Sequence, residues 1–177
     1  MKSRNHLLDG DLETIAIDVT EQPIERPTKR QCLYYSGKQK LHTIKVQLVI
    51  CLATLEILSV VCRKGKVHDY RIFKESCLAI APEINKLADS GYQGIAKLYT
   101  NGYTPIKKTW NQSLTGEASK FNREFAGRRI PIDGARFSAL SKKPIQGNIE
   151  TRVRHGMLWL RLSTSGIQPK YLNQHSH

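Results

Sequence analysis

Two aspartates stand in short apolar runs that are far apart in the chain. Asp18 lies within the strand-like run 14–20, and Asp89 ends the run 84–89. A buried, unpaired carboxylate is costly, so each position needs a compensating partner. Carboxylates brought together from separate strands are the ligands that hold divalent cations in phosphodiester chemistry. The two positions therefore predict a metal site that acts on a polyanion, with backbone N–H groups at strand ends and turns as the alternative partners.

Further acidic positions could belong to the same site. Asp133 follows Pro131, which suits the first turn of a helix, and the dipole of a helix start favours an anion. Asp133 is therefore either a third metal ligand or a helix-start acid. His68 and Asp69 are either a ligand pair or the start of a helix that Asp69 caps.

The chain is strongly basic, with 28 Lys and Arg against 15 Asp and Glu and a net charge of +13. Such an excess indicates a nucleic acid, an acidic membrane surface or an acidic partner. Tyr34 and Tyr35 lie among the basic residues and could stack on exposed bases, although a solvated loop is the alternative for this segment. The side chains expected to contact DNA phosphates are Arg26, Lys29, Arg30, Lys38, Lys40, Arg63, Lys64 and Lys66.

Size and composition fit one globular domain. A chain of 177 residues with 40% apolar content can bury a substantial core. The four cysteines lack the spacing of a zinc site or a disulfide framework, and the first residues lack the apolar region of a secretory signal. We therefore expect free thiols in a reducing cytoplasm. The apolar run 46–62 contains polar interruptions and many β-branched residues, which favour a buried hairpin over a membrane span.

The order of predicted elements indicates a mixed sheet with helices packed on it. Three antiparallel strands are expected over 14–20, 42–51 and 56–63, with a loop or arm over 22–40. The later elements are a helix over 69–81, short strands over 84–88 and 103–108, a helix through Leu114, Ala118, Phe121 and Phe125, and a further helix from Pro131.

Four segments carry a resemblance to a known family. They are Ile17–Pro27, Tyr34–Lys45, Gly65–Ser76 and Leu87–Gly94. In this order and spacing they resemble the DDE-type transposases of bacterial insertion sequences, in the insertion-sequence-five group with its DDE superfamily endonuclease domain. The resemblance covers about residues 14–133. It implies an RNase H-like α/β fold with a mixed five-stranded sheet flanked by helices, in which the first strand carries Asp18 and the fourth ends at Asp89.

The resemblance also implies an activity and its residues. It implies cleavage of element ends and transfer of the freed 3′-hydroxyl to target DNA, dependent on two Mg²⁺ or Mn²⁺ ions. Asp18, Asp89 and Asp133 would be the catalytic, metal-binding residues, and His68 and Asp69 would lie near the site. The expected partner is DNA, as element ends and as target, together with self-association and without a membrane, in the cytoplasm.

The chain departs from the family pattern after the second aspartate. The family's third acid is a glutamate that opens a basic helix, whereas here Asp133 is followed by Gly134. We expect a catalytic core over 14–137, between an N-terminal remnant over 1–13 without an upstream helix-turn-helix region and a degenerate or frameshifted tail over 138–177. The copy could thus be inactive. A non-catalytic nucleic-acid-binding remnant and an RNase H-like nuclease without strand transfer are the alternatives.

Overall fold

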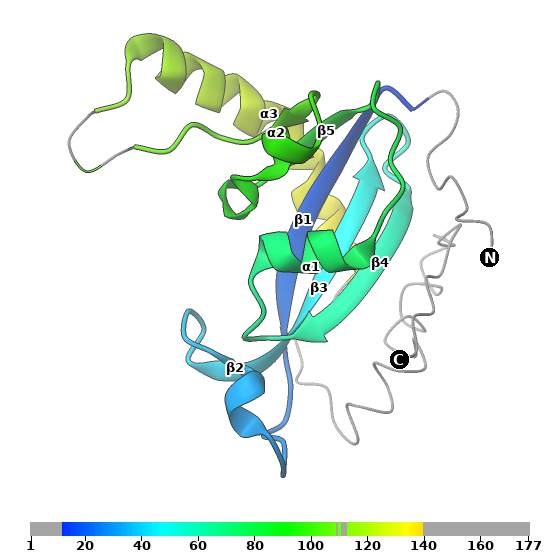
Figure 1. Cartoon of the computed structure of the whole chain (residues 1–177), viewed down its shortest axis with the longest axis vertical. Helices are drawn as coiled ribbons and strands as arrows, with labels where there is room; N and C mark the ends of the chain where they lie inside the picture. The colour runs from blue at the N-terminus through cyan, green and yellow to red at the C-terminus, as the bar shows by residue number, and fades with distance from the viewer. Residues whose placement is uncertain (1–11, 109, 111–112, 140–177) are drawn as a thin grey trace.

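The computed structural model describes residues 12–108, 110 and 113–139, and for 133–139 it describes the backbone alone. The expected N-terminal remnant up to residue 11 and the tail from residue 140 lie outside the described residues. Within the described part, helices flank one mixed sheet (Figure 1). The elements are β1 (Thr14–Pro23), η1 (Gln31–Leu33), β2 (Tyr35–Ser36), β3 (Leu41–Cys51), β4 (Ile57–Lys64), α1 (Asp69–Ser76), β5 (Asn85–Ala88), η2 (Ser90–Tyr92), α2 (Ile95–Leu98), β6 (Gly102–Tyr103) and α3 (Gly116–Ala139).

The central strand of the sheet is β1. It pairs antiparallel with β3 on one side and parallel with β5 on the other. β4 lies beyond β3 and β6 lies beyond β5, so the main order is β4-β3-β1-β5-β6, and the short β2 pairs with the start of β3. This mixed α/β architecture confirms the predicted fold class and is consistent with an RNase H-like fold.

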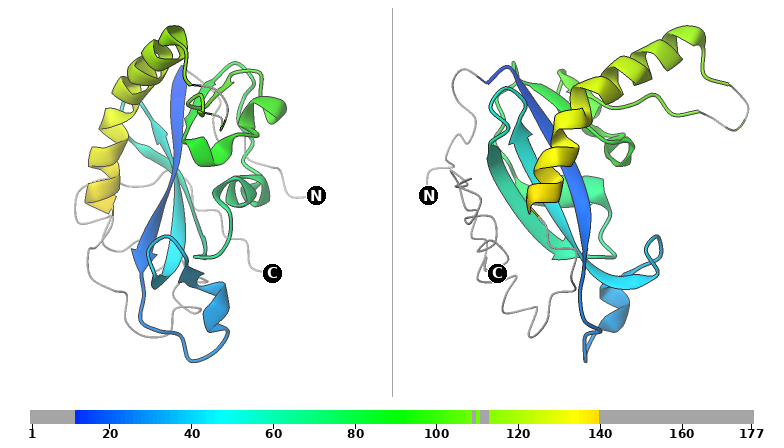
Figure 2. Two further views of the ribbon diagram at one scale, coloured as in Figure 1. Left: turned by 90° about the vertical axis from the view of Figure 1, so that its left-hand side faces the viewer. Right: turned by 180° about the vertical axis from the view of Figure 1, so that it is seen from behind.

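Alternating apolar residues give each face of the sheet its own core. In β1, Ile15 and Ile17 belong to the cluster that includes residues of α1 and α2, whereas Ala16 belongs to the cluster that includes Ile132 of α3. Figure 2 shows α3 on one side of the sheet and the smaller helices on the other. Side chains alternate along a strand, so Asp18 shares the face of Ala16, which α3 covers.

Helix α1 is shorter than predicted and is capped by a different residue. It ends at Ser76 because Cys77 adopts a left-handed backbone conformation with a φ of 47°. The cap is His68, whose Nδ1 accepts a hydrogen bond from the Tyr70 N–H at 3.3 Å. The prediction that Asp69 caps the helix is therefore wrong, since Asp69 is the first helical residue and its carboxylate is available for other contacts.

Helix α3 is continuous where two helices were predicted, because it runs through Pro131. Proline cannot donate to the carbonyl of Gly127 one turn earlier, and inside a helix it costs about 3 kcal/mol. The second half is nevertheless held against the sheet by Ile132, which is 1% exposed and belongs to the core on that face. The prediction that Asp133 lies at a helix start is therefore wrong, since its backbone lies inside α3.

The remaining strand predictions differ mainly in length. The β3–β4 hairpin confirms that the run 46–62 forms strands. The strand predicted over 103–108 is limited to β6, and Pro105, which lacks an N–H, follows closely. Among the described residues, no helix combines the length and the apolar character needed to cross a membrane.

Candidate active site

The parallel pairing of β1 and β5 brings Asp18 and Asp89 side by side. The paired register ends with Ile17 opposite Ala88, so the next residue on each strand is an aspartate. Neighbouring strands are about 4.8 Å apart. Asp18 is 5% exposed within β1, whereas the Asp89 side chain, just beyond the end of β5, is 52% exposed. One carboxylate is therefore held inside the fold, and the other meets solvent.

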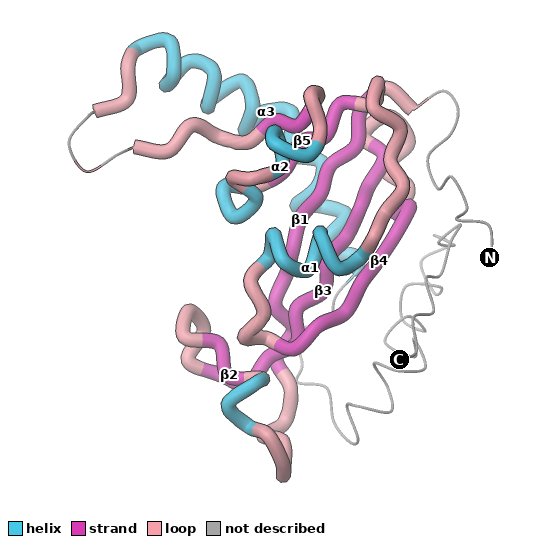
Figure 3. The backbone as a smooth tube through the Cα atoms, viewed as in Figure 1, coloured by secondary structure: helices cyan, strands magenta, loops and turns pink. Residues whose placement is uncertain are grey.

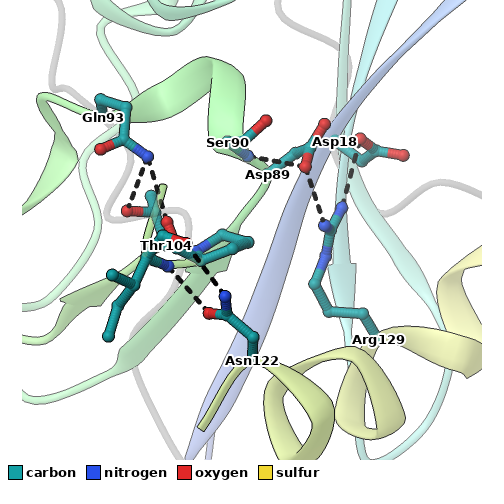
Figure 4. A network of polar contacts seen from close by, with 9 residues as sticks. Asp18, Asp89, Ser90, Gln93, Thr104, Asn122 and Arg129 are labelled. Atoms are coloured by element: carbon teal, nitrogen blue, oxygen red, sulfur yellow. Dashed lines mark hydrogen bonds and ion pairs between the residues drawn. The ribbon is translucent and has the colours of Figure 1, made fainter. Parts of the chain in front are cut away.

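Arg129 of α3 joins the two carboxylates. Its Nη2 lies 3.3 Å from Asp18 Oδ1, and its Nη1 lies 3.4 Å from Asp89 Oδ1 (Figure 4). The same Asp89 oxygen accepts the Ser90 N–H at 2.6 Å, which fixes the orientation of this carboxylate. The guanidinium of Arg129, on α3, thus contacts one carboxylate in β1 and one directly after β5.

Sequence reasoning did not identify Arg129. The helical spacing contains a signal, because Arg129 lies one turn after Phe125 and one turn before Asp133. Phe125 is 5% exposed, so this stripe of the helix faces the protein. Pro131 led to the prediction of a separate helix that begins near Asp133, whereas α3 runs through both Arg129 and Asp133.

The third predicted ligand stays a prediction. The backbone at Asp133 lies in α3, but its side chain is outside the described part of the molecule. Among the side chains that are described, no group of three His, Cys, Asp or Glu residues converges to hold a metal ion.

Asp69 lies beside the loop that follows Asp89. Its Oδ1 is 2.7 Å from the Nζ of Lys45 in β3. A Cβ built on Gly91 would lie only 3.0 Å from the other Asp69 carboxylate oxygen, so the absence of a side chain at Gly91 allows this close approach. His68, by contrast, is exposed and is used for helix capping.

Tyr92 is fully buried next to these carboxylates. Its hydroxyl donates to Gln47 Oε1 at 3.3 Å. Burial raises the pKa of the Tyr92 phenol far above its usual range, the negative charges of Asp69 and the two site aspartates raise it further, and Arg129 lowers it. Tyr92 is therefore a neutral hydrogen-bond donor, and its surroundings have a negative potential.

A polar network connects the loop after Asp89 to α3 (Figure 4). Gln93 Nε2 donates to the Pro105 carbonyl at 3.2 Å. On α3, the Asn122 amide accepts the Ile106 N–H and donates to the Ile106 carbonyl, each at 2.9 Å. Helix α3 is thus fixed both to the segment after β6 and to the two carboxylates.

The residues predicted to contact DNA occupy two adjoining segments, at the end of the sheet where β1 and β4 finish (Figure 3). The Lys66 N–H donates to the Leu33 carbonyl at 3.1 Å. A Cβ built on Gly65 would meet the Thr43 carbonyl oxygen at 2.6 Å, so only glycine allows this approach. Arg63 and Lys64 are half-buried, and the exposed members of the set are Arg26, Lys29, Arg30, Lys38, Lys40 and Lys66.

The two tyrosines in this region have different environments. Tyr34 is 4% exposed and belongs to the core, so the prediction that it stacks on bases is wrong. Its ring is instead covered by the core and by Lys64, whose Nζ lies 5.7 Å from the ring centroid. Tyr35 is 44% exposed, and its ring contacts that of His42 edge-on, so Tyr35 alone stays available for stacking.

The donor set suits a hard divalent cation. Mg²⁺ and Mn²⁺ prefer oxygen ligands, and Mg²⁺ is usually bound by one or two carboxylates while it keeps several waters. Asp18 and Asp89 supply such oxygens at a position where a cationic group, the Arg129 guanidinium, already lies between them. The residues present therefore fit the ion that the resemblance implies.

Comparison with known proteins gives two matches. A family model described as DDE superfamily endonuclease matches residues 17–153. The chain is also similar to a probable transposase for insertion sequence element IS702 from Microchaete diplosiphon, with 43% identity over 119 residues. The aligned region is 67% of this chain and 43% of that protein, so the chain spans less than half the length of this curated relative.

Proposed function

Because this chain belongs to the DDE superfamily endonuclease family, we propose that it contains the catalytic core of an insertion-sequence transposase. The core, taken as residues 14–137, cleaves DNA at element ends and transfers the freed strand to a target. The observation that carries the proposal is the pair formed by Asp18 and Asp89. The β1–β5 register brings these carboxylates together, and both contact the Arg129 guanidinium.

Asp18 and Asp89, with Asp133 as the third acid, would hold Mg²⁺ or Mn²⁺. Two bound divalent ions supply activation of the attacking oxygen and stabilisation of the leaving oxygen in a displacement at phosphorus. The contribution of the chain itself is orientation. Burial in β1 restricts Asp18, and the Ser90 N–H restricts Asp89.

DNA recognition falls to the exposed face of the site and to the basic segments. The exposed side of Asp89 gives a phosphate backbone access to the carboxylates. Lysines and arginines at the end of the sheet supply sequence-independent phosphate contacts, which position the duplex without reading its bases.

The test is a plasmid-nicking assay with Mg²⁺ or Mn²⁺ that compares the wild-type chain with Asp18→Asn and Asp89→Asn. Each substitution is nearly isosteric and removes one negative charge. We expect either substitution to reduce nicking to background. Glu117→Gln, which removes an exposed carboxylate from the first turn of α3, serves as the matched control and should nick like the wild type.

The outcomes separate the candidate functions. Nicking that survives both aspartate substitutions would contradict the proposed site. Wild-type DNA retention without nicking would indicate a non-catalytic binder. If the wild type nicks, a strand-joining assay with a free 3′-hydroxyl end distinguishes a transposase core from a nuclease that only cuts.

A further inference from the structure

The Arg129 guanidinium lies at the position that the proposed function assigns to a metal ion. It contacts one oxygen of Asp18 and one of Asp89, and the Arg129 side chain is only 18% exposed. Two adjacent carboxylates without a cation would repel each other. Arg129 therefore offsets one of the two negative charges in the absence of metal.

The geometry of this contact is loose for an ion pair. Charge-assisted N–H···O bonds are commonly about 2.7–2.9 Å long, whereas these distances are 3.3 and 3.4 Å. In addition, the buried Arg129 Nε has no hydrogen-bond partner within the described part of the chain. A buried cation with an unused donor has lost hydration that its contacts do not fully replace.

A divalent ion would use the same oxygens more closely. Mg²⁺ binds carboxylate oxygens at about 2.0–2.1 Å. The guanidinium and such an ion both need the space between Asp18 and Asp89, and both carry positive charge. One therefore excludes the other from this position.

We propose that Arg129 is a resident counter-ion that holds the carboxylate pair together without metal and is displaced when a divalent cation binds. This inference rests on the proposed function, because it takes Asp18 and Asp89 as metal ligands. It assigns Arg129 a positioning role that sets metal affinity, since metal binds only the fraction of molecules in which the guanidinium has left.

Displacement of the side chain does not require α3 to leave the sheet. Phe125 and Ile132, on either side of Arg129 along the helix, are both buried. Asn122 separately holds the helix to Ile106. The guanidinium, whose Cζ lies 6.0 Å from the centroid of the Phe125 ring, can move while its helix stays in place.

The experiment measures Mn²⁺ binding by titration calorimetry, together with the thermal midpoint in chelator and in saturating Mn²⁺. Variants are Arg129→Gln and, as matched control, Arg128→Gln, which removes the same charge from the exposed neighbour on α3. We expect Arg129→Gln to lower the Kd for Mn²⁺ by about fivefold or more. Fivefold is about the lower end of the change in affinity that one coupled equilibrium usually imposes on another. Arg129→Gln should also lower the thermal midpoint in chelator, and Mn²⁺ should restore it, whereas Arg128→Gln should change neither.

Each other outcome is decisive. An Arg129→Gln variant that binds Mn²⁺ with unchanged or weaker affinity overturns the counter-ion role but leaves the metal site standing. Mn²⁺ binding that is absent, or that persists in Asp18→Asn and Asp89→Asn, overturns the metal site and the inference with it. If Arg129→Gln does not fold in chelator, Arg129→Lys is tested instead, because it replaces the planar guanidinium with a point charge. The Kd of Arg129→Lys for Mn²⁺ should fall below that of the wild type. An unchanged Kd would contradict the inference.

Discussion

Asn122 binds both backbone polar groups of Ile106 through its side-chain amide, with 2.9 Å in each direction. The two hydrogen bonds resemble those that one residue pair makes between neighbouring strands, but here one partner is a side chain of a helix. They join α3 to the chain that follows β6, and α3 carries Arg129 to the carboxylates. The position of Arg129 is therefore supported in part by an amide that does not contact the two carboxylates.

Removal of this amide should weaken the docking of α3. We expect Asn122→Ala to lower the free energy of unfolding by about 1–3 kcal/mol, because two backbone groups lose their partner. Urea unfolding measures the change, with the exposed Lys120→Ala on the same helix as control, expected within about 0.5 kcal/mol of the wild type. An Asn122→Ala variant as stable as this control would show that the Ile106 contact contributes nothing to docking.

The buried pair formed by Tyr92 and Gln47 should show non-additive behaviour. Tyr92→Phe leaves Gln47 Oε1 without its donor, and Gln47 Nε2 already lacks a partner among the described residues. We expect a loss of about 1–3 kcal/mol for this single change and a smaller loss for the Tyr92→Phe/Gln47→Leu double variant, since an apolar pair leaves no unpaired group. A double-mutant cycle of unfolding free energies tests this expectation. Strictly additive losses would contradict it.

Cys62 should make the fold sensitive to alkali. Burial raises the pKa of its thiol from 9.0 to about 12, against a smaller lowering by Arg63. The folded chain therefore keeps a proton that the unfolded chain loses, so the stabilisation is complete below pH 9.0 and decreases as the pH rises towards about 12. The loss should be up to about 1.4 kcal/mol per pH unit.

Comparison with Cys62→Ala isolates this contribution. Urea unfolding across the window should show a steeper loss of stability in the wild type than in the variant. Below pH 9.0 the two proteins should depend on pH in the same way. Parallel curves throughout the alkaline range would mean that the thiol ionises equally easily in the folded and unfolded chains.

Lys38 offers a test of the basic segments. It is exposed between β2 and β3 and belongs to the set predicted to contact phosphates. Lys38→Gln should weaken binding to all DNA sequences alike and reduce the slope of log affinity against log salt by about 0.9, the value of one phosphate contact. Fluorescence anisotropy at several salt concentrations measures this slope. Lys97→Gln, an exposed lysine of α2 outside the set, should leave it unchanged.

The sequence was sufficient to predict the main strands of the sheet and the two strand aspartates. Apolar runs and their order specify strands strongly, because a shift by one residue would expose every buried side chain. Asp18 and Asp89 stand out as the acidic positions in such runs. Their roles stay a prediction, but their proximity follows from the parallel register of β1 and β5.

The features that could not be predicted depend on tertiary contacts. Pro131 is a strong local signal for a helix boundary, yet the burial of Ile132 keeps α3 continuous. Tyr34 lies in a basic, loop-like segment, and its ring is covered by core residues and by Lys64 from other parts of the chain. Arg129 was hidden for the same reason, since its partners come from distant strands.

The contact of Arg129 with the two aspartates has a consequence that depends on the order in which the chain is synthesised. A ribosome releases β1 and β5 before the helix that bears Arg129, so a nascent chain holds the two aspartates before this guanidinium can contact them. Their mutual repulsion opposes the β1–β5 pairing until α3 brings Arg129 to them. The docking of α3 and the partial charge compensation of the two aspartates are therefore coupled.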